Sequence, residues 1–507
     1  MLQIQHLTLI HRKDLRVLIH DFSLVLNRGD KAVLIGEEGN GKSSLLKWAA
    51  DPALIDDYME AEGIRSTQGE RIGYLPQELP AEDKNRSVYE FMCQSDAFCR
   101  ATPATLSERA HEWGIPLGLL YSEQRMGTLS GGEKVKIQMI RLLLDEPDIL
   151  LLDEPSNDID LETLEWMEGL IRDYDGGILY ISHDETLIER TANRVILLEQ
   201  LRHKQMCRHT VANIPFRQFM QERQEAFEKQ AQQAYSERRE EKNALERFRR
   251  IQQRVEHEQN TISRQDPSGG RLLKKKMASV KALERRYARE HEEMTEYPEM
   301  EGAIFQTFAR QQTIPAGRMV LDLHLRELSR YPGDPEPIPV DFTLSMRGPE
   351  KVCIIGPNGT GKTTLLRHIY ALLRENSDLK AAYMPQDYAE ALDPDISPVE
   401  YLAPSGRKEE ITEVRTRLGA LKYTHDEMLH PIRELSGGQK AKLLLLGLCL
   451  SDANVLILDE PTRNFSPLSG PQIRRLLKSF GGAIISVSHD RKYMSEVADR
   501  VVPLARL

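Results

Sequence analysis

The sequence predicts an α/β protein in which two similar domains are joined by a long α-helical hairpin. Residues 1–214 and 298–507 carry the same short motifs in the same order. The stretch between them, residues 215–297, is rich in Gln, Glu, Arg, Lys and Ala and contains no glycine other than Gly269 and Gly270. Such a composition favours helix. We therefore expect three domains with boundaries at these residues.

Length and charge agree with this division. The chain has 507 residues, enough for roughly three domains of ~150 residues each. Its net charge of −10 argues against a nucleic-acid binder. Residues 221–290, however, carry 18 Lys and Arg against 12 Asp and Glu, so this segment is +6 and the remainder is −16. A basic arm on an acidic body is the asymmetry that a function must explain.

Cysteine usage and hydropathy predict a soluble cytoplasmic protein. The five cysteines are widely scattered, and none forms a CxxC pair, which favours reduced thiols over a disulfide or zinc framework. No apolar run reaches the ~18 residues of a membrane span, and the N-terminal stretch lacks the apolar core of a signal peptide.

A phosphate-binding loop opens the first domain. An apolar strand, residues 32–35, runs into Gly36-x4-Gly41-Lys42-Ser43, the strand-then-helix context that this motif requires. Backbone N–H groups of the loop would wrap the phosphates, Lys42 would reach the β- and γ-phosphates, and Ser43 would hold Mg²⁺. The predicted ATP contacts of the loop are Gly36, Glu37, Glu38, Gly39, Asn40, Gly41, Lys42, Ser43 and Ser44.

Two weaker motifs follow the loop. Gln77 ends a short strand in RIGYLPQ, where a surface glutamine is the plainer interpretation. The sequence LSGGEK places Ser130, Gly131 and Gly132 at the start of a helix. Two glycines beside a serine form a nest of N–H donors that suits a phosphate. An ordinary helix cap by Ser130 explains the same residues, so both interpretations stay open.

A buried strand, ILLLDEP, ends in Asp153 and Glu154. Asp153 would reach Mg²⁺, and Glu154 would polarise the attacking water. A second DEP triplet, residues 145–147, follows a helical pattern and is interpreted as a helix end. His183 comes just after another apolar strand, where it would sense the γ-phosphate or play only a structural part.

The second domain repeats the motifs at a constant offset. Ser130 and Ser436, Glu154 and Glu460, and His183 and His489 are each 306 residues apart, whereas the DEP triplet at 145–147 has no counterpart at that offset. The repeat therefore supports Asp153 and Glu154 as the functional pair. The corresponding residues of the second domain are Gly356, Pro357, Asn358, Gly359, Thr360, Gly361, Lys362, Thr363, Thr364, Gln386, Ser436, Gly437, Gly438, Asp459, Glu460 and His489.

Five motifs in one order, twice, resemble the ATP-binding-cassette (ABC) superfamily. The resemblance implies two ABC-type P-loop nucleotide-binding domains that pack head to tail, with each ATP between one phosphate loop and the LSGG of the other domain. It implies Glu154, Glu460, His183 and His489 as catalytic residues. It implies Mg²⁺ near Ser43, Gln77, Asp153, Thr363, Gln386 and Asp459, and ATP contacts from Gln77, Gln386, Ser130, Gly131, Gly132, Ser436, Gly437 and Gly438.

The sequence departs from the superfamily pattern in two places. The segment after each DEP, T-N-H-L-D in relatives, is residues 156–160 in the first domain and residues 462–466 in the second, which lacks the aspartate. Communication between the sites is therefore expected to be asymmetric. His11 aligns with the aromatic residue that stacks on adenine, and no convincing equivalent precedes Gly356. Because both glutamates are present, we expect both sites to hydrolyse ATP.

The linker predicts a helical hairpin. From about Phe216 to Ile262 it is helix-forming throughout, which corresponds to roughly 70 Å at 1.5 Å per residue. Residues 264–271 contain Pro267 and two glycines and should break the helix. A second helical arm then continues to about Met294.

Basic side chains gather around the predicted bend. They suit the phosphates of structured RNA, although a solvated helix face or a coiled-coil arm explains them more simply. The predicted RNA contacts are Arg264, Arg271, Lys274, Lys275, Lys276, Lys281, Arg285, Arg286 and Arg289.

Two cassettes, a hairpin linker and its second arm KKKMASVKALERR resemble the ABC-F family. The resemblance implies an ATPase that binds the ribosome near its tRNA exit site, with the linker pointing at tRNA and rRNA, either as a translation factor or in antibiotic resistance. It also implies a monomer whose two cassettes pair within the chain. The alternative is the ATP-binding subunit of a separate membrane transporter, and the basic linker argues against it.

Overall fold

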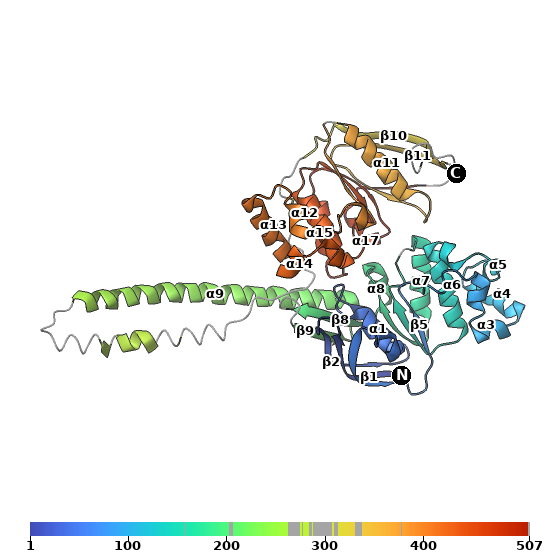
Figure 1. Ribbon diagram of the computed structural model, residues 1–507, viewed down its shortest axis with the longest axis horizontal. Coiled ribbons are helices and arrows are strands. Elements are labelled where there is room, and N and C mark those ends of the chain that lie inside the picture. Colours follow the sequence, from blue (N-terminus) through green and yellow to red (C-terminus); the bar gives the residue numbers. More distant parts are fainter. Residues whose placement is uncertain are drawn as a thin grey trace. The chain divides into compact units, whose positions relative to one another are not determined.

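The structure is a computed structural model that describes residues 1–157, 159–201, 206–261, 274–275, 277–282, 286, 307–308, 313–329, 337–376 and 378–504. The chain divides into two compact units. One consists of Met1–Phe216 together with Glu301–Leu507, and the other of Arg217–Met300. The first unit contains two α/β cassettes, coloured blue to teal and yellow to red in Figure 1.

The first cassette is built on a six-stranded sheet of order β5-β6-β7-β3-β8-β9, parallel except for the edge strand β9. Fully buried apolar runs, as in β6 and β7, are typical of parallel strands covered on both faces. A smaller antiparallel sheet, β2-β1-β4, covers one face. The strands are β1 (Leu2–His11), β2 (Val17–Leu26), β3 (Lys31–Ile35), β4 (Met59–Ser66), β5 (Ile72–Leu75), β6 (Ile149–Asp153), β7 (Gly177–Ile181), β8 (Arg194–Leu201) and β9 (Met206–Ala212).

The second cassette repeats this plan with a parallel five-stranded sheet of order β13-β14-β15-β12-β16 and a β10-β11 hairpin. Alternate residues of its strands enter different cores. Ile354 and Ile457 pack with α11 and the hairpin, whereas Leu456 and Leu458 pack with α15 and α16. The strands are β10 (Met319–Leu328), β11 (Ile338–Arg347), β12 (Lys351–Ile355), β13 (Ala381–Met384), β14 (Val455–Asp459), β15 (Ala483–Val487) and β16 (Arg500–Pro503).

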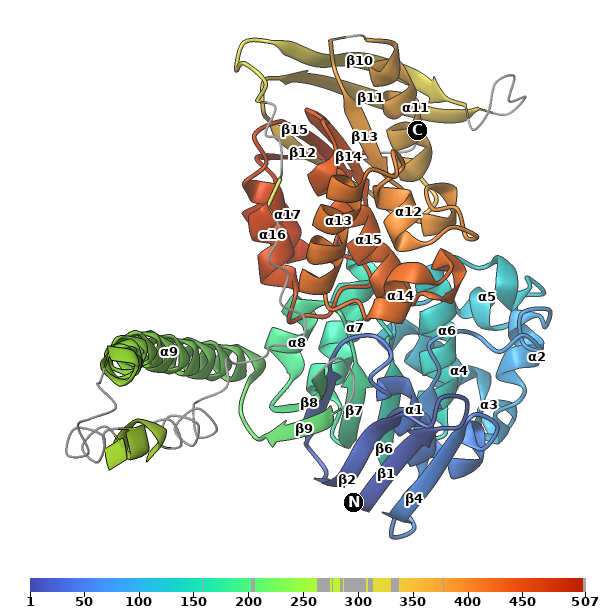
Figure 2. The ribbon, with the colours of Figure 1, turned by 60° about the vertical axis from the view of Figure 1, so that its left-hand side comes forward.

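Helices flank both sheets, and Figure 2 shows those of the second cassette around its strands. The helices of the first cassette are α1 (Lys42–Ala50), α2 (Val88–Met92), α3 (Asp96–Arg100), α4 (Pro103–Glu112), α5 (Leu117–Leu120), α6 (Gly131–Leu144), α7 (Leu161–Asp173) and α8 (Glu185–Thr191). Those of the second cassette are α11 (Lys362–Glu375), α12 (Pro398–Leu402), α13 (Lys408–Ala420), α14 (His425–Leu429), α15 (Gly437–Leu450), α16 (Gly470–Lys478) and α17 (Arg491–Glu496). Asp145 caps the end of α6, as expected for the DEP triplet that is not repeated.

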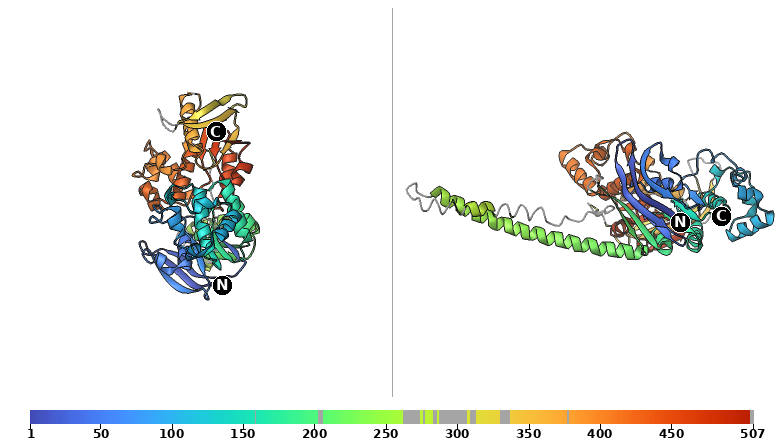
Figure 3. Two further views of the ribbon diagram at one scale, coloured as in Figure 1. Left: turned by 90° about the vertical axis from the view of Figure 1, so that its right-hand side faces the viewer. Right: turned by 90° about the horizontal axis from the view of Figure 1, so that it is seen from below.

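The second unit contains α9, an uninterrupted helix of 46 residues, Phe216–Thr261, which the right-hand view of Figure 3 shows along its length. The sequence predicted this first arm at residues 216–262. Residues 274–275, 277–282 and 286 of the second arm are helical. Val280 and Met277 pack against Phe248 and Val255 of α9, so the two arms contact each other as in a hairpin. The predicted breaker at 264–271 lies outside the described residues.

None of the helices in the described part of the chain combines the length and the apolar character that a membrane span needs.

Candidate functional site: two facing phosphate loops

Glycines let both phosphate loops turn sharply between strand and helix. A Cβ atom on Gly36 would lie 2.4 Å from the Leu198 carbonyl oxygen, and one on Gly356 would lie 2.6 Å from that of Leu504. Inside each turn the lysine ammonium group donates to loop carbonyls. Lys42 Nζ lies 2.9 Å from the oxygen of Gly36 and 2.9 Å from that of Glu37. The backbone is therefore already wrapped around the point that a phosphate would occupy.

The second loop is arranged in the same way. Lys362 Nζ lies 2.7 Å from the Gly356 carbonyl oxygen and 2.9 Å from that of Pro357. Gly361 has φ 91°, in the left-handed region, and a Cβ there would crowd Leu328 and Ile338.

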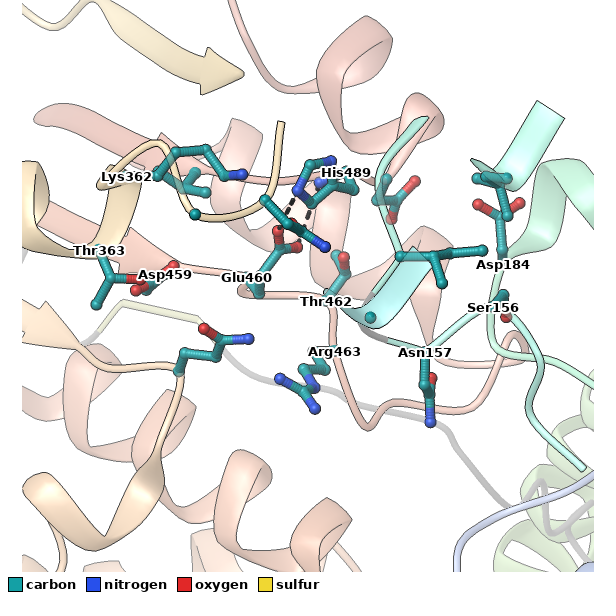
Figure 4. A pocket seen from close by; sticks show the side chains of 18 of the residues that line it. Ser156, Asn157, Asp184, Lys362, Thr363, Asp459, Glu460, Thr462, Arg463 and His489 are labelled. Atoms are coloured by element: carbon teal, nitrogen blue, oxygen red, sulfur yellow. Dashed lines mark hydrogen bonds and ion pairs between the residues drawn. The ribbon is translucent and has the colours of Figure 1, made fainter. Parts of the chain in front are cut away.

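We call the cavity beside the first loop the first site. It has a volume of about 370 Å³, and Lys42, Ser43, Gln77, Glu154 and His183 are among the residues that line it. The cavity beside the second loop, the second site, measures about 580 Å³. Figure 4 shows Lys362, Thr363, Asp459, Glu460 and His489 around it. Gln386 also lines it.

Asp153 offers a place for a divalent cation in the first site. It ends β6 and is 1% exposed, and its Oδ1 accepts a hydrogen bond of 3.0 Å from the Ser43 hydroxyl. Among the described residues no donor reaches its Oδ2. Burial, together with the charge of Glu154, raises the pKa of Asp153 to about 6. A bound Mg²⁺ would supply the missing partner, since hard oxygen donors of this kind suit that ion.

The equivalent carboxylate of the second site is in a similar position. Asp459 ends β14 and is also 1% exposed, and Thr363 lies beside it (Figure 4). Burial raises the pKa of Asp459. The donor sets of both sites, a hydroxyl, a carboxylate and a nearby glutamine, therefore fit the same ion.

Glu154 is held by donors on several sides. Its Oε2 accepts from Gln77 Nε2 at 3.0 Å and from the Asn157 amide, and its Oε1 lies 3.2 Å from His183 Nε2. Burial alone would raise the pKa of Glu154, but the contact with His183 and the charge of Lys42 lower it to about 2. Glu154 has φ 51°, a strained backbone conformation for a residue with a side chain.

Glu460 has the same backbone conformation, with φ 52°, but a different environment. Its Oε2 accepts from the His489 backbone N–H at 3.3 Å, and its Oε1 lies 3.8 Å from His489 Nε2. Burial raises the pKa of Glu460 to about 8. Burial and the charge of Lys362 lower the pKa of His489 to about 4, so this imidazole is neutral at pH 7.

The LSGG segments begin helices that face the opposite phosphate loops. Gly438, in the first turn of α15, donates its N–H to Glu38 of the first loop. Gly131, in the first turn of α6, lines the second site with Lys362. Each site is therefore completed by the other cassette.

Both serines also cap their helices. Ser130 accepts from the N–H of Glu133 at 3.3 Å, and Ser436 accepts from that of Gln439 at 3.3 Å. The plain cap interpretation thus describes the geometry as well, and in α15 it leaves the Gly438 N–H to donate to Glu38 of the opposite loop.

Contacts across the cassettes are dense at the first site. Glu37 Oε2 lies 2.5 Å from Lys442 Nζ of α15, and Glu37 Oε1 accepts from the Ser469 hydroxyl at 3.1 Å. His183 Nδ1 lies 2.7 Å from the carbonyl oxygen of Phe465. Although burial disfavours the charged form, Lys442 lowers the pKa of Glu37. Glu37 and Glu38 thus bridge to the second cassette by their side chains.

Some loop side chains do not face the cavities. The Asn40 amide donates to the carbonyl oxygen of Leu198 at 3.0 Å and is buried. The Thr360 hydroxyl donates to the Pro357 carbonyl oxygen at 2.9 Å. These two residues stabilise the loop by their side chains. His11 does line the first site, where its Nδ1 lies 2.8 Å from Asp14 Oδ1.

The sequence-based site assignment did not include Asn157, Arg463 and Phe465. Asn157 donates to Glu154, Arg463 lines the second site, and the carbonyl of Phe465 contacts His183. The 306-residue offset pairs Asn157 with Arg463, so their difference was visible in the sequence. The carbonyl contact of Phe465 had no signal, because any residue carries a carbonyl.

Among the predicted RNA contacts, Lys274, Lys275, Lys281 and Arg286 are exposed. The other five, Arg264, Arg271, Lys276, Arg285 and Arg289, lie outside the described residues.

The protein-family model described as "ABC transporter" matches residues 19–157 and 340–463, which together make up more than half of the chain. The chain belongs to the ABC transporter family. It is 28% identical to the ATP-binding protein Uup of Escherichia coli (strain K12), over 94% of this chain and 76% of that protein. It is 25% identical to the mouse ATP-binding cassette sub-family F member 2, over 96% of this chain and 77% of that protein.

Solved structures show the same architecture. The archaeal ribosome recycling factor aABCE1, in complex with the stalk protein aP1, matches with a TM-score of 0.59 at 17% identity, over 99% of this chain and 90% of that chain. The RNase-L inhibitor matches with a TM-score of 0.56 at 15% identity, over the same shares. These comparisons confirm the predicted ABC-F ATPase and its fold of two nucleotide-binding domains with a long helix between them.

Proposed function

We propose that this ATPase binds two ATP molecules with Mg²⁺ between its cassettes and uses their closure to act on the ribosome in the cytoplasm. The proposal rests on one observation: each phosphate loop faces the LSGG helix of the other cassette. In the first site Gly438 donates to Glu38, and in the second site Gly131 lines the cavity. ATP held at such a junction favours the closed arrangement, and its hydrolysis removes that preference.

Each composite site draws residues from both cassettes. Residues 1–214 and 298–507 would be the two ATP-binding domains, and residues 215–297 the linker. The first site would join Lys42, Ser43, Gln77, Asp153, Glu154 and His183 to Ser436, Gly437 and Gly438. The second would join Lys362, Thr363, Gln386, Asp459, Glu460 and His489 to Ser130, Gly131 and Gly132.

Glu154 and Glu460 are assigned as the general bases that accept a proton from the attacking water. Mg²⁺ would be held by Ser43, Asp153 and Gln77 in the first site and by the matching residues in the second, where it would neutralise phosphate charge. His183 is oriented by the Phe465 carbonyl of the other cassette. Separation of the cassettes would remove that carbonyl, so hydrolysis in the first site is coupled to closure.

The linker supports the ribosome as the partner. The described basic residues of its second arm, Lys274, Lys275, Lys281 and Arg286, are exposed and suit phosphate contacts. Two of the solved structures of similar fold are of a ribosome recycling factor and of a ribosome-bound complex of Pelota and ABCE1. That likeness concerns the fold, and the basic arm is the feature of this chain that extends it to RNA.

Sedimentation through a sucrose cushion tests this proposal. The double variant Glu154→Gln with Glu460→Gln should bind ATP without hydrolysing it and co-pellet with ribosomes in ATP but not in ADP. If it stays in the supernatant at low salt, the ribosome is not the partner. The wild-type chain in ATP, which turns over, is the matched control.

The linker is tested separately by replacing Lys274 and Lys275 with Gln. Loss of phosphate contacts should weaken co-pelleting and reduce its salt dependence. A change of Lys408 and Arg415 in α13 to Gln removes the same charge from the second cassette and serves as the control. An equal effect of both variants would mean that net charge, and not the linker, determines binding.

Expression in a susceptible bacterium separates general translation from drug protection. A raised inhibitory concentration for drugs that act at the peptidyl-transferase centre would assign this chain to resistance, and an unchanged one to translation.

A further inference from the structure

A buried ion pair whose two residues line neither cavity joins the two cassettes. Arg474 of α16 contacts Glu185 of α8 in bidentate fashion, with Nη1–Oε1 at 2.7 Å and Nη2–Oε2 at 3.1 Å. The side chains are 3% and 7% exposed. Arg474 also donates to Glu496 of its own cassette at 2.7 Å. Such a pair has well-defined geometry and is costly to break.

A second pair occupies the equivalent position with its charges exchanged. Arg491 Nη1 of α17 lies 2.8 Å from Glu168 Oε2 of α7, and both side chains are largely buried. The offset of 306 residues that relates the cassettes carries Glu168 onto Arg474 and Glu185 onto Arg491. The two contacts are therefore one contact, repeated by internal symmetry, in which acid and base have changed places.

The neighbouring charges follow the same division. Lys492 of the second cassette lies 3.1 Å from Glu185 Oε2 and 2.5 Å from Glu189 Oε1 of the first, and Arg491 Nη2 lies 3.5 Å from Asp184 Oδ1. The first cassette therefore presents acids at this interface, apart from Arg190, which donates to Glu168 of its own cassette at 2.9 Å. The second presents bases, apart from Glu496 and Asp490, whose charges act on Arg474 of the same cassette.

This arrangement has a consequence for partner choice. If two first cassettes from different chains paired head to tail, position 185 of one would face position 168 of the other, which places Glu against Glu. Two second cassettes would place Arg474 against Arg491. Like charges held together at an interface cost several kcal/mol in general, and such repulsion is how interfaces reject wrong partners.

We propose that these charge-reversed pairs make the first cassette select the second cassette of its own chain and reject a like cassette of a second copy. The inference rests on the head-to-tail pairing of the proposed function and adds the residues that enforce it. It concerns only which cassettes pair with each other. The molecular mass in solution therefore tests it, and neither ATP nor ribosomes are needed.

A charge exchange tests it in the full chain. In Glu185→Arg, the new arginine faces Arg474 within the chain but would face Glu168 of a second copy. The mass measured by light scattering during size exclusion should therefore roughly double, as expected for a symmetric dimer. Arg474→Glu should dimerise in the same way through its second cassettes.

The double variant Glu185→Arg with Arg474→Glu restores opposite charges within the chain. Charge then favours the intrachain and the two-copy pairings alike, and because the linker holds the two cassettes of one chain at high effective concentration, the protein should return to the mass of the wild type. A discrete doubled mass of the single variants, distinct from a broad aggregate, shows that they are folded. The proposal is overturned if both single variants keep the wild-type mass, or if the double variant is as associated as either single one. Thermal unfolding of Glu185→Gln, which removes charge without reversing it, serves as the stability control.

The charge-selection proposal and the ribosome proposal can fail independently of each other. Wild-type mass in both single variants, with the hydrolysis-deficient chain still co-pelleting with ribosomes, would reject only the selection by charge. Loss of ribosome binding, with the charge exchange behaving as expected, would reject only the ribosome as partner.

Discussion

The two sites contain the same motifs but differ in what surrounds them. At the first site, Glu37, Glu38 and His183 contact the opposite cassette, and Glu154 is held by hydrogen bonds that lower its pKa to about 2. The second site is a wider cavity in which burial raises the pKa of Glu460 to about 8. A repeated motif thus supplies the reacting groups, while neighbouring residues set their protonation and the contacts that close each site.

Differences at three positions account for much of the contrast. Pro357 and Asn358 stand in the second loop where Glu37 and Glu38 stand in the first. Arg463 stands where Asn157 donates to Glu154. The first site is thus closed by carboxylates of the chain itself, and its base is ionised at neutral pH.

The largest effect is expected from removing the bases one at a time. At pH 7, Glu154→Gln should lower ATP turnover by about 10²- to 10⁴-fold in the first site, the usual range for a general base. Glu460→Gln should change total turnover far less, because Glu460 is mostly protonated there. Phosphate release measures both, and equal losses at pH 7 would mean that the two sites are equivalent.

The contact between Glu37 and Lys442 can be tested by replacing the two equivalent lysines of the LSGG helices. Lys442→Met leaves Glu37 buried without its cationic partner, with only the Ser469 hydroxyl still seen to donate to it among the described residues, and should lower the free energy of unfolding by about 3 kcal/mol. Lys136→Met, the matched control, removes only a contact 5.8 Å above the Trp166 ring, worth about 0.5–1 kcal/mol. Denaturant unfolding compares them, and a larger loss for Lys136→Met would show that the first site is not the bridged one.

The different pKa values of Glu154 and Glu460 predict different pH profiles for the two single variants. In Glu154→Gln, the remaining turnover depends on Glu460, which accepts a proton only when ionised, so activity should rise about tenfold from pH 7 to pH 9 as the pH passes its pKa. In Glu460→Gln, where Glu154 is ionised throughout this range, turnover should stay nearly flat. Phosphate release measured from pH 7 to pH 9 tests this prediction. A flat profile for Glu154→Gln would contradict the assignment of Glu460 as a general base with a raised pKa.

The smallest effect is expected at Glu38. Its carboxylate takes the Gly438 N–H that a γ-phosphate would use. Glu38→Asn, which copies the second loop, should therefore tighten ATP binding to the first site several-fold, by relief of like-charge repulsion, and affect ADP less. Fluorescent ATP and ADP titrations measure this in a Lys362→Ala background. Asn358→Glu in a Lys42→Ala background is the reverse experiment. Equal changes in ATP and ADP affinity would show that Glu38 does not compete with the γ-phosphate for the Gly438 N–H.

From the sequence alone we could predict the two cassettes, the phosphate loops, the paired Asp-Glu motifs and the long first arm of the linker. These follow from local patterns: a strand, a glycine-rich turn and a helix at fixed spacing, or an unbroken helix-forming composition. A constant offset of 306 residues further distinguished the working DEP motif from the one at 145–147.

Other features became apparent only in three dimensions. Three contacts join residues nearly 300 or more positions apart in the chain, and no local pattern encodes them. They are Glu37 with Lys442, His183 with the carbonyl of Phe465, and Glu185 with Arg474. Protonation likewise depends on burial and neighbouring charge in three dimensions. Glu154 and Glu460 occupy identical motifs, yet the fold gives one an ionised and the other a largely protonated carboxyl at neutral pH.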